Sequence, residues 1–180
     1  MLKQSPIGIV ALVLVFVMMA MPRMVIAQTI PDDNTVAMIR ANYLYQFANN
    51  NDWPAEWKKG RFVVGVVGNP DVLEIMASKY ATKPIGSQSM NVIGVNELQT
   101  TPQVHVVFID RSKKSEIAKY VREYKGKSTL IVANWEGALA QGAHINFLSI
   151  EGSIRFELNK TAMTEALITP GVKILQWAIQ

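Results

Sequence analysis

Apolar positions recur with helical spacing in the first patterned segment beyond the N-terminal region. They fall at residues 36, 39, 43, 44 and 47, which predicts a helix with one buried face. Asp33 or Asn34 can cap its start, because either side chain can accept a hydrogen bond from a free backbone N–H. Asn49–Asn51 are expected to end the helix, since asparagine competes for backbone hydrogen bonds and tolerates left-handed conformations.

The end of this helix lies in an aromatic stretch, YLYQFANNNDWP, at residues 43–54. The stretch is either a ligand-binding box or a helix end followed by a turn. Helical spacing places Tyr43 and Phe47 on the buried face and leaves Tyr45 as the aromatic expected to be exposed. Trp53 precedes a proline, which disfavours helix and favours a turn back towards the next strand. We favour an architectural role, with Tyr45 and Trp53 as candidates for a partner surface.

Near-continuous apolar runs rich in β-branched residues predict buried strands. Three such runs are Arg61–Val67, Val104–Asp110 and Thr129–Ala133. Met90–Gly94 is a shorter, fourth strand candidate. Helices are expected between them, at Asp71–Tyr80 and from Ser112 or Ser115 to Gly126. Strands that alternate with helices predict a parallel sheet covered on both faces.

The last quarter of the chain has a different pattern. His144–Ile150 and Gly152–Leu158 are predicted to be consecutive strands, the second with strict alternation of apolar and polar residues. Two short helices are expected at Asn159–Ala166 and Pro170–Gln180. The predicted fold is therefore a three-layer α/β/α sandwich with a mixed, mainly parallel sheet and a C-terminal antiparallel hairpin, in a single domain at residues 28–180.

The N-terminal residues 1–27 have the pattern of a secretory signal. Lys3 precedes an uncharged run at Ile7–Met21, and small residues at Val25 and Ala27 suit cleavage after Ala27. The run has 15 residues, fewer than the roughly 20 that span a bilayer. We therefore expect export without stable membrane insertion, with a retained membrane anchor as the alternative.

Composition narrows the function classes. The chain has a net charge of +4, but Lys3 and Arg23 lie in the expected signal, and 16 basic against 14 acidic residues remain after it. No basic cluster larger than Lys58-Lys59 or Lys113-Lys114 remains, so nucleic-acid binding is not expected. The chain has no cysteine, which excludes disulfides, thiol catalysis and thiolate metal sites.

The residues that usually carry catalysis are sparse. The two histidines, His105 and His144, lie within strand-like patterns and are interpreted as hydrogen-bonded structural residues. A zinc site needs three or four ligands, and no nucleophile motif of the Gly-x-Ser-x-Gly type is present. We expect no enzyme activity, no metal and no cofactor.

Four polar residues are candidates for binding. Asn69 follows a strand and precedes a helix, which suits either a tight helix start or an anion site, and Asn134 follows the third buried strand. Arg155 and Glu157 share one face of the last strand. They can form an ion pair, or Arg155 can offer its guanidinium to a carboxylate. These residues allow one function for the protein as a small-molecule sensor that binds an anionic metabolite or nucleotide, and this is the alternative to the regulatory function described next.

An ordered set of segments resembles the YfiR/HmsC-like family of exported bacterial proteins. The segments are NYLYQFANNNDWP, VVGNP, VHVVFID, TLIVAN, QGAHINF and IRFELN. The resemblance implies a periplasmic, non-enzymatic regulator with a compact α/β fold and a tendency to form homodimers. The implied partner is an inner-membrane signalling protein, a diguanylate cyclase or a sensor kinase. Repression of a cyclase would lower cyclic-di-GMP and limit biofilm formation.

The chain departs from the family pattern in two places. Some relatives carry cysteines near the first strand and before the H-V-x-F-I segment, whereas this chain has none. Redox control through disulfides therefore cannot operate here. Where relatives often have Gly-Gly, this chain has Gly142-Ala143, and the methyl group limits the backbone freedom of the second position.

Overall fold

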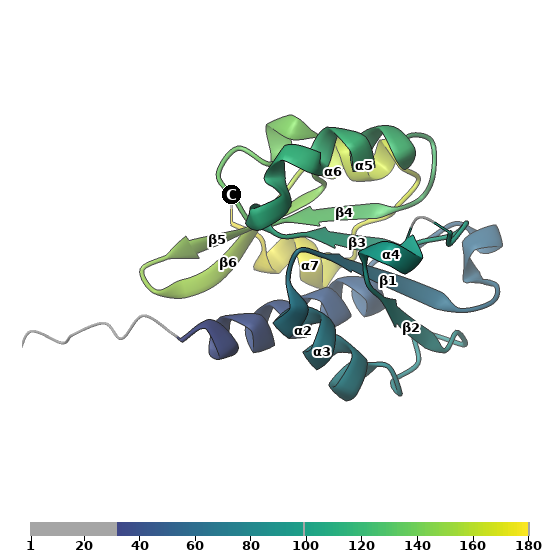
Figure 1. Cartoon of the computed structure of the whole chain (residues 1–180). Helices are drawn as coiled ribbons and strands as arrows, with labels where there is room; N and C mark the ends of the chain where they lie inside the picture. Colours follow the sequence, from purple (N-terminus) through teal and green to yellow (C-terminus); the bar gives the residue numbers. More distant parts are fainter. Residues whose placement is uncertain (1–31, 99, 180) are drawn as a thin grey trace, which may run out of the picture.

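Six strands form one sheet at the centre of the molecule, and helices cover both faces (Figure 1). The computed structural model describes residues 32–98 and 100–179, so the signal expected at residues 1–27 lies outside the described residues. The strands are β1 Phe62–Val67, β2 Met90–Ile93, β3 Val106–Ile109, β4 Leu130–Ala133, β5 Ile145–Ile150 and β6 Ser153–Leu158. Their order across the sheet is β2-β1-β3-β4-β5-β6.

The sheet is mixed, as the sequence predicts. Strands β1 to β5 pair in parallel, and β6 returns antiparallel to β5 with Phe147 opposite Phe156. The chain places β2 on one side of β1 and β3 on the other. In open α/β sheets ligands usually bind beyond the carboxyl ends of the strands at such a switch point, which here lies between β1 and β3.

The helices are α2 Asp33–Asn50, α3 Pro70–Ile75, α4 Val95–Leu98, α5 Ile117–Glu123, α6 Lys160–Glu165 and α7 Val172–Trp177. Short 3₁₀ turns lie at η1 Ala55–Lys58, η3 Arg111–Glu116 and η4 Leu139–Gln141, and a π-helical turn at η2 Met76–Tyr80. In Figure 1, α2 and α3 lie below the sheet, with α4 and α5 above it. The predicted α/β/α sandwich is confirmed.

Two predicted helices are divided in the structure. The helix expected at residues 71–80 is α3 followed by the π-helical turn η2. The helix expected after Asp110 begins as the 3₁₀ segment η3, in which Lys113 is non-helical, and continues as α5. Helix α4 is an addition, because four residues are too few to show a helical period in the sequence.

Helix α2 begins one turn earlier than its apolar pattern and has a different cap. Asp32, and neither of the two predicted residues, accepts a hydrogen bond from Thr35 N at 2.7 Å. The asparagines end the helix as predicted: Asn51 Nδ2 donates to Phe47 O at 3.0 Å. Asn51 Oδ1 also accepts from Gly171 N at 3.2 Å, which ties the helix end to the C-terminal segment.

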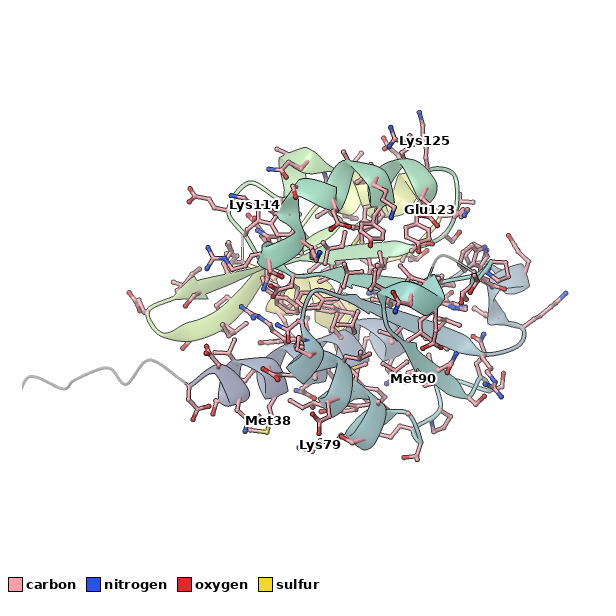
Figure 2. All side chains as sticks on the ribbon, in the orientation of Figure 1. Met38, Lys79, Met90, Lys114, Glu123 and Lys125 are labelled. Carbon is pink, nitrogen blue, oxygen red and sulfur yellow. The ribbon has the colours of Figure 1, made fainter. Side chains whose placement is uncertain are left out.

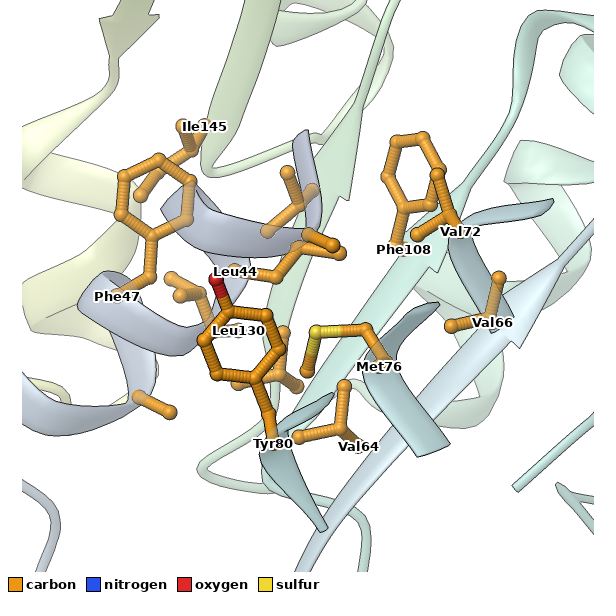
Figure 3. Packing of buried hydrophobic residues seen from close by; sticks show 14 of the residues in the cluster. Leu44, Phe47, Val64, Val66, Val72, Met76, Tyr80, Phe108, Leu130 and Ile145 are labelled. Atoms are coloured by element: carbon orange, nitrogen blue, oxygen red, sulfur yellow. The ribbon is translucent and has the colours of Figure 1, made fainter. Parts of the chain in front are cut away.

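The larger core lies between the sheet and the helices α2 and α3. Figure 3 shows part of it, with Leu44 and Phe47 of α2 and Met76 of η2 packed near sheet residues such as Val64. Phe47 has no exposed surface and makes an edge contact with Phe156, with ring centroids 4.9 Å apart. Burying a ring of this size contributes roughly 1.5–3 kcal/mol, so α2 is fixed on the sheet by its aromatic face.

The second core lies on the opposite face, beneath α4 and α5. Leu98 of α4 and Ile117 and Tyr120 of α5 pack over inner positions of β1, β3 and β4. Gly65 in β1 makes room for Leu98, because a Cβ at this glycine would lie 1.9 Å from Leu98 Cδ1. The glycine inside the β1 run is therefore a packing requirement of α4.

Candidate functional site

The carboxyl ends of β1, β3 and β4 meet in one polar cluster. Asn69 Nδ2 and Asn134 Nδ2 both donate to Asp110 Oδ2, at 3.1 and 2.8 Å. Asp110 Oδ1 accepts from Ser112 N at 3.0 Å. The structure thus brings together two residues that the sequence placed separately at strand ends, and it adds the carboxylate that joins them.

Internal hydrogen bonds occupy the polar groups of this cluster. Asn69 Oδ1 accepts from Val72 N at 2.9 Å and so caps α3, which confirms the interpretation of Asn69 as a tight helix start. Asn134 Oδ1 accepts from Arg111 N. Burial raises the pKa of Asp110, but the hydrogen bonds from Ser112, Asn69 and Asn134 outweigh it and the net pKa is lowered. The cluster holds three strand ends together around an ionised carboxylate.

Arg40 is a residue near this cluster that the sequence did not single out. It projects from α2, and its Nε is buried without a hydrogen-bond partner among the described residues. Burial lowers the pKa of Arg40, and the negative charge of Asp110 opposes that shift. A single arginine within a helical pattern gives no signal for this, because its approach to Asp110 depends on how α2 crosses the sheet.

The two aromatic candidates for a partner surface are more enclosed than expected. Trp53 is 5% exposed, and its indole N–H donates to Ser128 O at 2.9 Å. Trp53 is therefore a core residue, and the expectation that it belongs to a partner surface is wrong. Tyr45 is half-buried and stacks on Tyr80 at 5.0 Å between ring centroids, with Lys83 Nζ 5.4 Å from the ring of Tyr45. The expectation that Tyr45 is the exposed aromatic is therefore wrong.

Arg155 and Glu157 do not form an ion pair in the described part of the chain. Glu157 Oε1 instead accepts from Asn146 Nδ2 at 2.8 Å. Arg155 is exposed and lines an open hollow of about 390 Å³ with Tyr43 and Trp177. Because Trp177 is 43% exposed, this hollow combines an accessible aromatic surface with a guanidinium that has no ion-pair partner among the described residues.

The two histidines have the same structural role. His105 N donates to Val63 O at 2.9 Å, and His105 Nδ1 accepts from Val63 N at 3.1 Å. His144 repeats this with Ile131, at 2.8 and 3.1 Å. Each imidazole takes the place of a strand carbonyl and extends a parallel ladder by one residue. Burial lowers the pKa of both rings, that of His144 to about 4, so both are neutral near pH ~7.

The side chains in the described residues offer no recognisable catalytic centre. No three His, Asp or Glu side chains between residues 32 and 179, residue 99 aside, converge so that they could hold a metal ion. Figure 2 shows charged residues such as Lys79, Lys114, Glu123 and Lys125 spread over the surface and not gathered at one place. None of the helices that the structure describes is long and apolar enough to cross a bilayer.

Comparison with known families identifies the family of this chain. A family model described as YfiR/HmsC-like matches residues 37–179, which is most of the chain. The chain belongs to the YfiR/HmsC-like family. The match begins within α2 and ends after α7, so it includes every strand of the sheet. No curated protein matches the chain.

The segments that carry the family resemblance contain the features described above. The segment VVGNP includes Gly68, whose positive φ of 81° leads into the Asn69 cap. The segment QGAHINF includes Gly142, with φ 100°, where a Cβ would lie 2.8 Å from Val121. Ala143 beside it is fully buried, so the close approach that a glycine pair allows is needed only at Gly142. The segment IRFELN supplies Arg155 and Glu157 on the edge strand β6.

Proposed function

We propose that this protein is an exported, non-enzymatic regulator that binds the periplasmic part of an inner-membrane signalling protein. The simplest target is a diguanylate cyclase, whose repression lowers cyclic-di-GMP and limits biofilm formation, and a sensor kinase is the other partner of this kind. The observation that carries the proposal is membership of the YfiR/HmsC-like family over residues 37–179. The signal-like pattern at residues 1–27 supports export.

The surface around the Arg155 hollow is the proposed contact with the partner. Arginine and tryptophan are the residue types that most often dominate interface energies, and here Arg155 and Trp177 line one hollow with Tyr43. Arg155 lies on the edge strand β6 and has no salt-bridge partner among the described residues. An acidic group on the partner, with an apolar neighbour, matches this surface.

Localisation and crosslinking test the proposal. The protein carrying a C-terminal epitope is expected in the periplasmic fraction, and crosslinking in intact cells is expected to capture an inner-membrane protein with a cyclase or kinase domain. Deletion of the gene is expected to raise cyclic-di-GMP. A protein found in the cytoplasm would exclude the whole proposal, and an unchanged cyclic-di-GMP level would exclude the cyclase as the target.

Two substitutions test the proposed contact surface. Arg155→Glu and Trp177→Ala are each expected to weaken partner capture by tenfold or more, about 1.4 kcal/mol, because each removes a central interface group. Lys114→Glu is the matched control, since Lys114 is an exposed cation on the opposite layer of the molecule (Figure 2). If all three variants capture the partner as well as the unaltered protein does, the interface does not include the Arg155 hollow. Circular dichroism confirms that each variant is folded.

The same hollow also supports a second candidate function, a sensor of an anionic metabolite. Its volume of about 390 Å³ suits a small molecule, and Arg155 offers the charge. The other two candidates for this role are Asn69 and Asn134, and the side-chain amides of both already donate hydrogen bonds to Asp110. A thermal-shift screen of nucleotides and amino acids is expected to show stabilisation that Arg155→Glu abolishes. No stabilisation by any of them would remove this candidate. The family resemblance also implies a homodimer. Light scattering of the purified protein is then expected to give the mass of two chains, and the mass of one chain would exclude the homodimer.

A further inference from the structure

His105 and His144 have equivalent positions, but only His105 uses both ring nitrogens within the described chain. Each Nδ1 accepts from a backbone N–H of the neighbouring strand, so the proton of the neutral ring is on Nε2. His105 Nε2 donates to Trp57 O at 2.8 Å. For His144 Nε2, no acceptor lies within hydrogen-bond distance among residues 32–98 and 100–179. Nε2 is not among the fully buried polar atoms that lack a partner in the described residues, so it keeps some contact with solvent and its N–H is free to donate to a ligand.

The unpartnered edge of His144 belongs to the lining of a hollow of about 470 Å³. The hollow lies between the end of α5, the start of β4 and the side of α6. Its walls are Val121, Ile131, Ala162, Ala166 and Tyr124, whose ring is apolar but whose hydroxyl is buried without a hydrogen-bond partner among the described residues. His144 is nine-tenths buried there, at 9% exposure. Since Nδ1 is bound to β4, the ring edge with Nε2 is the polar group that His144 can present to the hollow.

Charges around the hollow favour an anionic group on an apolar body. Lys125 is exposed and Lys127 half-buried at its rim, against one acidic residue, Glu165. Figure 2 shows Lys125 at the end of α5, directed away from the sheet. The carbonyl end of α5 also lies here and disfavours a bare anion. An apolar body is therefore needed for affinity, and the walls provide its contact surface.

We propose that this hollow, the His144 pocket, binds a small carboxylate with an aromatic or aliphatic body. One carboxylate oxygen accepts from His144 Nε2–H, in the way that the carbonyl of Trp57 does at His105. Lys127 compensates the charge, and Ile131 and Ala162 contact the apolar body. The pocket shares no lining residue with the hollow at Arg155 and Trp177, and the proposal does not depend on binding of a protein partner.

Nuclear magnetic resonance of the isotope-labelled mature chain tests the pocket. Benzoate and octanoate are the probes. Each is expected to bind saturably with a dissociation constant of about 1 mM or below, shifting the Nε2 resonance of His144 and the amide of Ile131 but not the ring of His105. Inorganic phosphate and cyclohexylamine are expected to cause no such shift. Unshifted His144 resonances with both carboxylates, or equal binding of phosphate, would overturn the proposal.

Substitutions distinguish the pocket from other surface binding. Ala162→Phe fills the hollow from α6 and is expected to weaken benzoate binding at least about tenfold. Thr161→Phe, an exposed neighbour outside the pocket, is the matched control and is expected to leave binding unchanged. His144→Asn keeps an acceptor for Ile131 N–H but lacks the Nε2 donor, and about tenfold weaker binding is expected. Unchanged affinity in Ala162→Phe and His144→Asn would also overturn the proposal.

Discussion

At the scale of single residues, the two histidines show how a side chain can substitute for backbone. Each ring accepts the N–H that a parallel strand would otherwise direct at a carbonyl. The sequence supports a structural role for both, because each lies in an apolar strand. It does not show which nitrogen is used, since this depends on the register between β1 and β3 and between β4 and β5.

The hydrogen bond from His105 Nε2 to Trp57 O makes His105 the more important of the two histidines for stability. His105→Asn keeps the acceptor for Val63 N–H but leaves Trp57 O without its donor, and a loss of about 1–3 kcal/mol in unfolding free energy is expected. His144→Asn is expected to cost less, because its Nε2 has no acceptor within the described chain. Urea denaturation of both variants measures the difference. Equal losses would show that ring packing, and not the Trp57 hydrogen bond, decides the stability.

At the scale of elements, α4 and Gly65 depend on one another. Gly65→Ala is expected to destabilise the protein by about 1–3 kcal/mol, because the added Cβ meets the buried Leu98 at 1.9 Å. Gly94→Ala is the control, since its Cβ would make an ordinary contact at 3.5 Å. In the double variant Gly65→Ala/Leu98→Ala the loss is expected to be smaller than the sum of the single losses. Additive losses in urea denaturation would exclude direct coupling of the two positions.

Element prediction succeeded where a pattern was long or continuous and failed where neighbours decide. The strands β1, β3 and β4 are apolar throughout, so the sequence alone predicts them, with ends one or two residues too long at β3. Tyr45 is enclosed because the π-helical turn carries Tyr80 to it. Trp53 is buried because Ser128, 75 residues away, accepts its N–H. Contacts of that separation leave no trace in local spacing.

At the scale of the whole molecule, the predictable part of the candidate site was its position in the sheet. The sequence places Asn69 and Asn134 each at the end of a predicted strand, and a parallel sheet brings such strand ends to one edge. The sequence does not show that Asp110 lies between them and takes up both amides. The exposed surface at Arg155 arises because β6 is an edge strand and because Trp177 of the C-terminal helix α7 lines the same hollow. Neither arrangement can be read from the local sequence pattern.

The stability of the whole fold is expected to fall in acid because buried neutral histidines resist protonation. Burial lowers the pKa of His105, and that of His144 to about 4, from the ordinary value of 6.5. As pH falls below 6.5, the unfolded chain takes up protons that the folded rings do not, so unfolding becomes more favourable down to about pH 4. His144 alone contributes a loss on the order of 2 kcal/mol between pH ~7 and pH ~4.5.

The lowered pKa of Asp110 acts in the same direction at still lower pH. Its ionised form stabilises the fold above the ordinary aspartate pKa of 3.8, and this stabilisation is lost as pH falls through the lowered folded value. Urea midpoints measured between pH ~7 and pH ~3 are therefore expected to decrease in two stages. In His144→Asn the first stage is expected to be smaller, because asparagine does not titrate, while the second stage is unchanged. An identical pH profile in that variant would contradict the assignment of the first stage to the His144 ring.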